Sequence, residues 1–385
     1  MKRNRKKNKK TIHKGGGLTS KRSKSCIFRP NIPCDKKSIR SNKKISKISF
    51  SNSKKEDEIN NIIVKIKGQK KYFVTIVKTC KTPDYNTIHK HEKDIKECLE
   101  YNKLKKTDLI DSSMFTGDWI GGGTLEKYFE KNIKSNDINS LEKSFIDIMS
   151  KMVNVFLGLV ILNNNDIVHL DIKPSNIMYD KNIFKIIDFG LSSKLDDIEH
   201  FKNRAYKESK TNRIYLWYPP SYLISQLSLE ELNELEKYVK NHHFSNYYKT
   251  EADVYDKIRR HYKQSTHMTY NTNYYKLVRK GIIKFKTQED IDNKFKCELD
   301  TIDAYSLGII FPYLFIKNDL LKYIKDSNIL KSFFELFKLM INPEVSRRIG
   351  IREATLLLNS LIVLNNGPNK LSEIKRIFKQ KKNKL

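Results

Sequence analysis

The sequence predicts an α+β fold in which a strand-rich first third precedes a long series of helices. Ile45–Phe50 alternates in the manner of a half-buried strand, and Tyr72–Val77 and Ser113–Ile120 are rich in β-branched and aromatic residues. In Lys54–Ile66, isoleucines recur at i, i+3, i+4 and i+7, the spacing of one buried helix face. Leu141–Asn163 predicts a longer helix with an apolar face that packs in a core.

Length and composition limit the class of protein. The 385 residues suffice for one large domain or two lobes, and a hydrophobic content of 38% with a formal charge of +31 predicts a soluble chain. The longest apolar runs, Met152–Leu162 and Ile309–Ile316, are shorter than a bilayer-spanning helix. The basic N-terminus lacks the apolar core of a secretory signal. We therefore expect an intracellular protein without a membrane partner.

The five cysteines are odd in number, scattered, and without CxxC spacing. This pattern predicts free thiols in a reducing compartment and argues against a disulfide framework or a zinc site. The cysteines are Cys26, Cys34, Cys80, Cys98 and Cys297.

The large positive charge has two interpretations. It is compatible with nucleic acid, an anionic membrane surface or acidic protein substrates as partners. Lysine, asparagine and isoleucine are all abundant, however, and the lysines are spread along the chain, so we favour a compositional origin for most of the charge. The exceptions are two basic tails, residues 1–14 and 371–385, which predict a disordered N-terminus and a weak contact with nucleic acid.

The stretch Val168–Gly190 carries residues suited to phosphoryl transfer. Asp171 can accept the proton of an attacking hydroxyl, and Lys173 can offset the charge of a transferring phosphoryl group. Asn176 and, twelve residues later, Asp188 offer the oxygen ligands that Mg²⁺ or Mn²⁺ prefers. An ordered set of this kind arises by chance far less often than a single motif.

These residues resemble the catalytic loop and the metal-binding loop of eukaryotic-type protein kinases. The resemblance implies a two-lobed, kinase-like fold with a small, mainly β N-lobe over residues 15–120 and a larger helical C-lobe over 121–370. It also implies ATP with Mg²⁺ or Mn²⁺ as cofactors, and protein substrates. Lys173, two residues after Asp171, implies transfer to serine or threonine, whereas His169 and Phe189 are expected to pack behind the site.

The same resemblance assigns residues of the N-lobe. Lys47 is the candidate for the lysine that holds the α- and β-phosphates, with Lys43 and Lys44 as alternatives. Glu58, beside the apolar face of its helix, is expected to form an ion pair with Lys47, and Glu56 is the alternative.

The glycine-rich loop that covers ATP in this family is altered. If Ile27 contacts adenine, the three glycine positions fall on Ser20, Arg22 and Ser25, and Gly15–Gly17 lie too early in the chain. Three interpretations remain: a shifted loop, replacement of glycine by small and basic residues, or a flexible linker at the glycines.

A second glycine run, Gly121–Gly123, ends a predicted strand, and Thr124 is placed to cap the following helix. This arrangement resembles the kinase hinge and implies that backbone groups at Asp118–Ile120, including Ile120, contact adenine.

Two departures from the family concern regulation and packing. Leu170 replaces the arginine that receives an activation-loop phosphate, so we expect activity without loop phosphorylation. Ser221 replaces the glutamate that usually pairs with the buried arginine at Arg348. Because an unpaired buried guanidinium is costly, we expect another acid to take over, from the insertion for example, or a more exposed arginine.

An insertion is predicted over residues 222–299, because the DxxSxG motif beginning at Asp303 comes about eighty residues after Pro220. The aspartate of this motif implies an anchor for the catalytic loop. The insertion is too long to lack structure in a compact domain. Its residues include many tyrosines, lysines and arginines, so packed helices, a protein-docking surface and nucleic-acid stacking all remain open, with packed helices favoured.

The resemblance is closest to the divergent serine/threonine kinases of large DNA viruses. It rests on the Cys-Ile-Phe-Arg-Pro run within Cys26–Cys34, the placement of Lys47, and the Tyr218-Pro219-Pro220 ending. It implies a host-cytoplasmic or virion location. The alternatives are a pseudokinase scaffold on a kinase fold and a basic nucleic-acid-associated protein.

Overall fold

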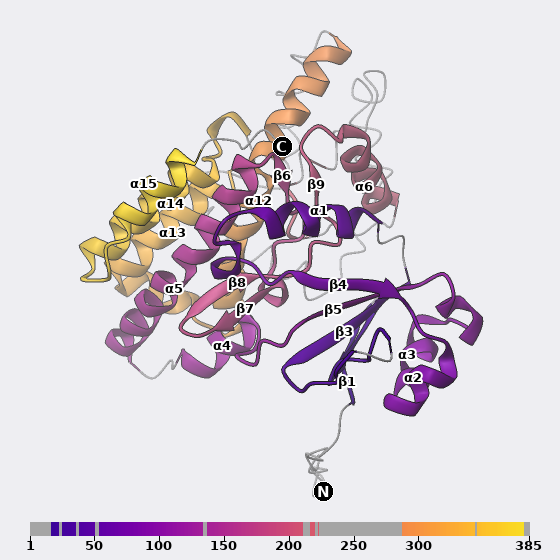
Figure 1. Cartoon of the computed structure of the whole chain (residues 1–385). Helices are drawn as coiled ribbons and strands as arrows, with labels where there is room; N and C mark the ends of the chain where they lie inside the picture. Colours follow the sequence, from indigo (N-terminus) through magenta and orange to yellow (C-terminus); the bar gives the residue numbers. More distant parts are fainter. Residues whose placement is uncertain are drawn as a thin grey trace, which may run out of the picture. The chain divides into compact units, whose positions relative to one another are not determined.

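A computed structural model describes residues 17–22, 25–35, 38–50, 54–133, 137–210, 216–219, 222, 287–342 and 345–380 (Figure 1). The chain forms two compact units. The first, here called the sheet unit, comprises Met1–Asn60 and Val74–Trp119; the second, the helical unit, comprises Asn61–Phe73 and Ile120–Leu385. The N-terminal tail and most of the insertion, including residues 223–286, lie outside the described residues.

The sheet unit holds a five-stranded antiparallel sheet in the order β1-β2-β3-β5-β4. A register shift between Leu18 and Ser20 interrupts the β1–β2 ladder. In the β2–β3 ladder, Ile27 lies opposite Lys47. The strands are β1 (Gly17–Arg22), β2 (Ser25–Arg29), β3 (Lys44–Ser49), β4 (Ile76–Lys81) and β5 (Ser113–Asp118).

Helices also belong to this part of the chain. α1 (Lys54–Lys65) begins in the sheet unit, whereas α2 (Tyr85–His91) and α3 (Ile95–Asn102) are inserted between β4 and β5. The Asp84 side chain caps α2 by accepting a hydrogen bond from the amide of Thr87 at 3.0 Å. The apolar faces of α2 and α3 pack against β2, β3 and β5 in one core, formed by Cys26, Phe28, Ile32, Ile48, Ile88, Ile95, Cys98, Leu99, Leu109 and Met114.

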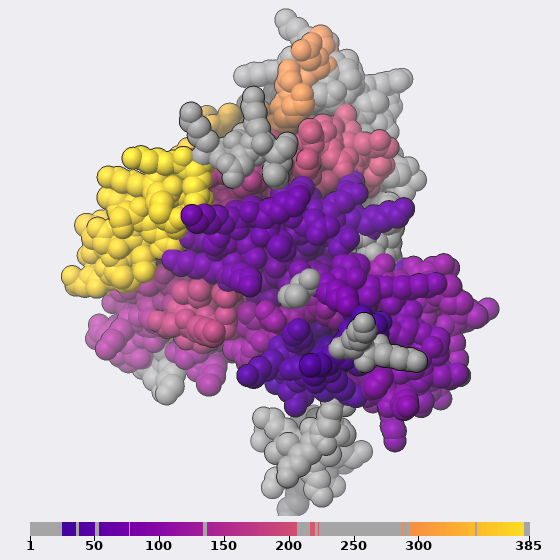
Figure 2. Space-filling view, viewed as in Figure 1, coloured from indigo at the N-terminus to yellow at the C-terminus, as the bar shows by residue number. Residues whose placement is uncertain are grey.

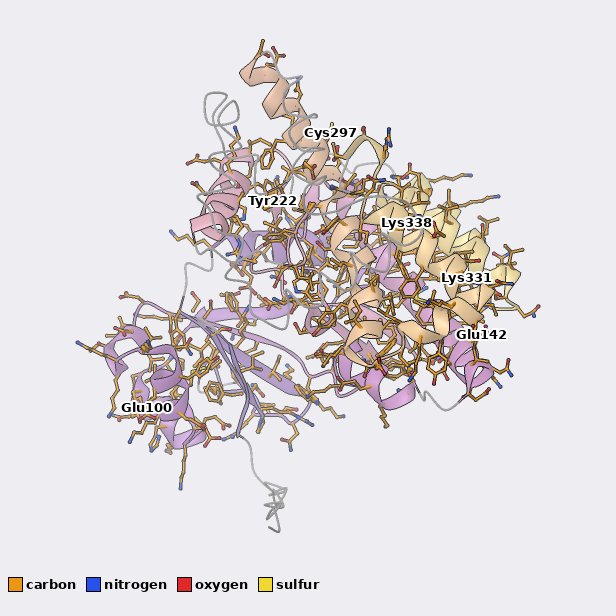
Figure 3. All side chains as sticks on the ribbon, turned by 180° about the vertical axis from the view of Figure 1, so that it is seen from behind. Glu100, Glu142, Tyr222, Cys297, Lys331 and Lys338 are labelled. Carbon is orange, nitrogen blue, oxygen red and sulfur yellow. A yellow bond between two sulfur atoms is a disulfide. The ribbon has the colours of Figure 1, made fainter. Side chains whose placement is uncertain are left out.

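The prediction of free thiols is wrong for four of the five cysteines. Cys26 on β2 is bonded to Cys98 on α3, and Cys34 is bonded to Cys80 on β4. Only Cys297 is free, and it is exposed (Figure 3). The partners are 72 and 46 residues apart in sequence, and sheet and helix packing brings them together. Local spacing therefore carried no signal of this pairing.

The helical unit is built around α5 (Ile138–Asn164), a 27-residue helix with most of its residues buried. Two segments, α5 and Phe295–Lys317 of α12, are long and apolar enough to cross a membrane by composition, but 78% of each apolar window is buried inside the protein. Core packing therefore accounts for their hydropathy. The other α-helices in the described part of this unit are α4 (Leu125–Asn132), α6 (Ile198–Lys210), α12 (Gln288–Lys317), α13 (Asn328–Met340), α14 (Ile351–Leu364) and α15 (Leu371–Lys379).

Two short antiparallel strand pairs lie in the helical unit and position its loops. β6 (Ile167–Val168) pairs with β9 (Ser193–Lys194), and β7 (Ile177–Asp180) pairs with β8 (Ile183–Ile186). The chain segments joining them contain the predicted catalytic loop, between β6 and β7, and the predicted metal-binding loop, between β8 and β9.

Two element predictions differ from the structure. The strand expected at Tyr72–Val77 begins only at Ile76, and Tyr72 and Phe73 are buried in the helical unit. Leu371–Lys379, predicted as part of a basic tail, forms α15, because Ile374 and Ile377 provide a buried apolar side. In Figure 2 the C-terminal helices form a continuous surface, coloured yellow.

Candidate active site

The sheet unit contains a buried ion pair on the strand where the phosphate-binding lysine was predicted. Lys47 Nζ lies 2.7 Å from Glu56 Oε1, and their side chains are 17% and 8% exposed. The alternatives Lys43 and Lys44 are exposed. Asn60, one turn after Glu56, accepts a hydrogen bond from the amide of Ile76 at 3.1 Å and thereby ties α1 to β4. The helix that carries the acid is therefore fixed against the sheet.

The prediction that Glu58 pairs with Lys47 is wrong, because Glu56 forms the ion pair and Glu58 is exposed. The buried face of α1 consists of Glu56, Ile59, Asn60 and Ile63, at the i, i+3, i+4, i+7 spacing. Position 58 lies about 200° from position 56 around the helix axis. Extending the isoleucine pattern towards the helix N-terminus by one turn identifies Glu56, and that signal was present in the sequence.

The residues predicted to cover the nucleotide lie on β1 and β2. Ser20 pairs in register with Ile27, and Ser25, which is buried, pairs with Arg22 on β1 and Ser49 on β3. Positions 20, 22 and 25 are therefore strand residues, and residues 23–24, which join the two strands, lie outside the described residues. Gly17 begins β1, and residues 15 and 16 are not described.

The run from Ile120 to Thr124 belongs to the helical unit, and its glycines have a structural role. A Cβ on Gly122 would lie 2.1 Å from the carbonyl oxygen of Tyr179, and Gly123 has a φ of +83°. The close approach is held by a hydrogen bond from the amide of Tyr179 to the carbonyl of Gly123 at 2.9 Å. The hydroxyl of Thr124 caps α4, as predicted.

The catalytic loop brings three predicted residues into direct contact in the helical unit. Lys173 Nζ lies 2.9 Å from Asp171 Oδ1, and Asn176 Nδ2 donates to Asp171 Oδ2 at 2.7 Å and to its backbone carbonyl at 2.9 Å. Asn176 is fully buried, and Asp171 is 7% exposed. These contacts fix the Asp171 carboxylate, a proton acceptor, beside a cationic amine.

The catalytic loop is also anchored by an aspartate of α12. Asp303 on α12 accepts hydrogen bonds from the amides of His169 at 2.7 Å and Leu170 at 2.9 Å. Burial raises the pKa of Asp303, while His169 and the two amide donors act in the opposite direction. Leu170 adopts a φ of +61°, which is unusual for a residue other than glycine, and the Tyr218 hydroxyl donates to its carbonyl at 2.9 Å. The anchor predicted for Asp303 is thus present.

The metal-binding loop lies directly beside the catalytic loop. The amide of Ile187 donates to the carbonyl of Asn176 at 3.0 Å, and the next residue, Asp188, has a φ of +68°. Phe189 is buried against His169, with ring centroids 5.1 Å apart, and against Phe73 at 5.8 Å. His169 and Phe189 are therefore packing residues, as the sequence predicted.

The donor set fits a hard divalent cation bound together with phosphate oxygens. Asn176 presents its Nδ2 to Asp171, so the oxygen of the amide is the atom suited to a metal ion. Asp188 supplies a carboxylate from the adjacent loop. Within the described part of the chain, no group of three or more His, Cys, Asp or Glu residues forms a metal site. Two oxygen-bearing side chains completed by substrate phosphates match the usual coordination of Mg²⁺.

Leu170 lies in an apolar cluster that the sequence did not predict. This residue, which replaces the phosphate-receiving arginine of the resemblance, is fully buried. Its neighbours come from α6, the 216–222 region and α12; the cluster contains Val168, Leu170, Phe201, Ala205, Tyr218, Tyr222, Phe295, Leu299 and Ile302. Tyr222 also donates its hydroxyl to the carbonyl of Phe201 at 2.8 Å. Apolar packing therefore connects the catalytic loop to α6.

The buried arginine has an acidic partner from the insertion. Arg348 Nη1 lies 2.8 Å from Glu298 Oε2, and the two side chains are 0% and 2% exposed. Arg348 also donates to the carbonyl of Asn342 at 2.9 Å and to the Thr301 hydroxyl at 3.1 Å. Ser221 lies outside the described residues. Of the two expectations for Arg348, replacement of the acid is confirmed and greater exposure is wrong.

The sheet unit, the larger helical unit and the two loops described above define the two-lobed protein kinase fold, of the α+β class. Residues 35–226 match the protein kinase domain family model, so this part of the chain is a protein kinase domain. The match begins after β2, and the altered nucleotide-covering strands therefore lie outside it.

Curated relatives agree with this assignment over short segments. The chain is 28% identical over 119 residues to death-associated protein kinase 2 of Homo sapiens, covering 28% of this chain and 30% of that protein. It is 39% identical over 87 residues to calcium-dependent protein kinase 3 of Plasmodium yoelii yoelii, covering 22% and 15%. It is 34% identical over 113 residues to the titin homolog of Caenorhabditis elegans, covering 28% and 1%. The chain thus spans less than a third of each of these relatives.

Proposed function

We propose that this protein transfers the γ-phosphoryl group of ATP to serine or threonine hydroxyls of protein substrates. The observation that carries the proposal is the contact of Asp171 with Lys173 and Asn176, one hydrogen bond away from the loop that holds Asp188. A binding scaffold has no need of all four side chains. Their retention favours an active enzyme over a pseudokinase.

Each residue has a distinct role in the proposed reaction. Asp171 orients the substrate hydroxyl and accepts its proton, and Lys173 stabilises charge on the transferring phosphoryl group. Asn176 and Asp188 hold the divalent metal ion, which supplies charge neutralisation at the phosphates when bound. Lys47, fixed by Glu56, binds the α- and β-phosphates.

The preference for serine and threonine rests on Lys173, two residues after the proposed base. The test is Mg²⁺-dependent transfer of labelled phosphate from ATP to a mixture of acidic and basic acceptor proteins, followed by phosphoamino-acid analysis. Phosphoserine and phosphothreonine are the expected products. Phosphotyrosine as the main product would contradict the assigned specificity while leaving the kinase activity established.

We also infer that activity does not require phosphorylation of the activation segment. Leu170 offers no charge to a phosphate, and it lies in one apolar cluster with Phe201 and Tyr218, two residues of the segment that the structure describes. Replacing the hydroxyl residues Tyr206, Ser209, Thr211 and Tyr215 together, with phenylalanine or alanine, should leave the rate within a few-fold of wild type. A loss of activity in a variant with unchanged thermal stability would overturn this inference.

The assignment to kinases of the large-DNA-virus type is likewise a proposal. It is supported by the Cys26–Cys34 run, the position of Lys47 within its strand and the Tyr-Pro-Pro ending at Pro220. A host-cytoplasmic or virion location follows only if that origin is correct.

A further inference from the structure

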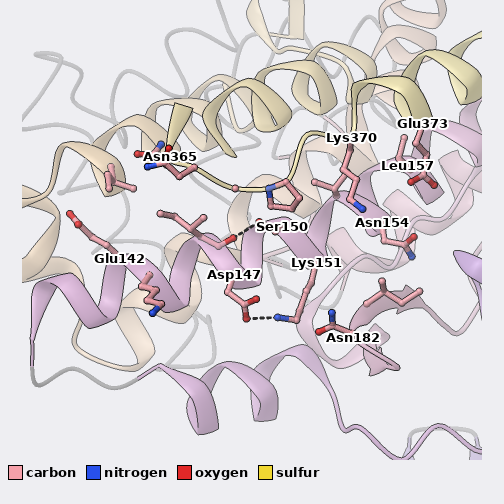
Figure 4. A pocket seen from close by; sticks show the side chains of 18 of the residues that line it. Glu142, Asp147, Ser150, Lys151, Asn154, Leu157, Asn182, Asn365, Lys370 and Glu373 are labelled. Atoms are coloured by element: carbon pink, nitrogen blue, oxygen red, sulfur yellow. Dashed lines mark hydrogen bonds and ion pairs between the residues drawn. The ribbon is translucent and has the colours of Figure 1, made fainter. Parts of the chain in front are cut away.

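A pocket in the helical unit lies between α5 and the turn that joins α14 to α15 (Figure 4). Its volume is about 650 Å³, within the range of pockets that bind drug-sized molecules. Its lining does not include Asp171 or Asp188, so it is separate from the candidate active site. The apolar lining comes mainly from Ile146, Val153 and Leu157 of α5.

One buried acceptor beneath the pocket surface lacks a donor. Asn154 is 5% exposed, and its Nδ2 donates to the carbonyls of Lys71 at 2.9 Å and Phe184 at 2.7 Å. Because both of these partners accept hydrogen bonds, the orientation of the amide is fixed. Among the described residues, no donor reaches Asn154 Oδ1. Because this oxygen is buried beneath the pocket surface, a ligand in the pocket does not reach it, and the Asn154 side chain serves to hold the Lys71 and Phe184 carbonyls beside the pocket.

The charges around the pocket are unevenly compensated. Lys71 forms an ion pair with Glu373, and Lys151 forms one with Asp147. The third acid of the lining, Glu142, accepts a hydrogen bond from the Ser327 hydroxyl.

Two further lysines line the pocket, Lys143 from α5 and Lys370 before α15. In the described part of the chain neither forms an ion pair, although the Lys370 charge acts on Glu373. The surplus charge facing the pocket is therefore positive, and it favours a ligand with carboxylates.

We propose that this pocket docks an extended acidic peptide segment of a partner protein. The carboxylates of the peptide would lie near Lys143 and Lys370, and an apolar side chain would pack on the α5 lining. Charge complementarity selects an acidic peptide over a basic one. The inference goes beyond the proposed function, because binding at this pocket does not require phosphoryl transfer.

The pocket is also joined to the metal-binding loop by continuous contacts inside the helical unit. The Tyr72 hydroxyl donates to Glu373 at 2.7 Å, and Asn154 holds the carbonyl of Lys71. Phe73, the residue after Tyr72, packs on Phe189. Glu373 and Asn154, which line the pocket, therefore hold the segment 71–73 that supports Phe189. A bound peptide should slow hydrogen exchange at the amide of Ile186, which donates to the carbonyl of Tyr72.

The test measures fluorescence anisotropy of a fluorescein-labelled octapeptide of alternating leucine and glutamate, with a leucine–lysine octapeptide as the charge-reversed probe. The double variant Lys143→Glu/Lys370→Glu should weaken binding of the acidic peptide by about tenfold or more. Lys375→Glu, an exposed position on α15 outside the pocket lining, is the matched control and should change affinity less than twofold.

Three results would overturn the proposal. They are no binding of the acidic peptide up to about 1 mM, equal binding of the lysine peptide, and equal weakening by the control variant. Competition by free glutamate at matched concentration would assign the pocket to a small carboxylate and would also refute peptide docking. Because Lys143 is exposed and Lys370 is half-buried, both variants should fold, and thermal melting verifies this before binding is measured.

Discussion

The buried pair between Arg348 and Glu298 gives a sharp prediction about how the insertion stabilises the helical unit. Replacing Glu298 with alanine removes the carboxylate that lies 2.8 Å from the Arg348 guanidinium, a group that is 0% exposed. Loss of one partner from a buried ion pair typically costs about 3–5 kcal/mol, because the remaining charge stays desolvated.

The structure places the expected cost at the lower end of that range. The neutral partners Asn342 and Thr301 remain bonded to Arg348, and the Tyr305 ring lies 5.2 Å from the guanidinium carbon. Glu298 Oε1 lacks a hydrogen-bond donor among the described residues, which further lowers the net value of the pair. We expect Glu298→Ala to reduce the free energy of unfolding by about 3 kcal/mol.

Urea denaturation followed by tryptophan fluorescence measures this loss. Trp217 is a suitable reporter, because its carbonyl accepts a hydrogen bond from Ser306 on α12, the helix that carries Glu298. The matched control is Glu335→Ala, which removes an exposed acid paired with Lys338 at 3.1 Å and should cost less than about 1 kcal/mol.

A double variant separates the ion pair from other effects at Glu298. Because Glu298→Ala/Arg348→Met removes both charges, it should be less destabilised than the sum of the two single changes. Additive losses, or a Glu298→Ala loss equal to that of the control, would refute the argument that the insertion neutralises Arg348.

Three other predictions concern the sheet unit. Glu56→Gln should lower kcat/KM for ATP by about 10- to 100-fold while Glu58→Gln stays near wild type, and equal effects in steady-state assays would contradict the assigned pair. Reduction of Cys26–Cys98, which closes a 72-residue separation, should lower stability by up to about 4 kcal/mol in calorimetry, whereas an unchanged melting temperature would argue against the bond. Burial raises the pKa of Glu92 from 4.5 to about 7, so the folded state binds its proton more tightly and stability falls as pH rises through that interval. Glu92→Gln should flatten this slope in pH-dependent melting, and an unchanged slope would assign it to other groups.

The catalytic centre was predictable because its chemistry is local in sequence. Asp171, Lys173 and Asn176 lie within six consecutive residues, so their order and spacing could be recognised in the sequence. The helix α5 and the anchor at Asp303 followed from similarly clear patterns. The fold class followed from the resemblance to protein kinases that these residues carry, and the strand and helix patterns along the chain agree with it.

The features that were missed depend on contacts distant in sequence or on helix phase. Cys26 and Cys98 meet only because α3 packs on the sheet, and no local pattern encodes that contact. Glu58 was preferred over Glu56 by proximity to the isoleucines, although the buried face includes Glu56. The replacement acid for Arg348 was expected from the insertion, but only the course of α12 identifies Glu298.

Transfer of labelled γ-phosphate from ATP to an acceptor protein, compared between wild type and Asp171→Asn, tests the central claim most directly. The amide cannot act as the proton acceptor, and the expected loss in rate is about 100- to 10,000-fold. ATP binding and thermal stability should remain close to wild type, which separates lost chemistry from lost folding. We predict that both proteins bind ATP and that only the wild type transfers phosphate at an appreciable rate. Equal transfer by the two proteins would contradict the kinase assignment of this site.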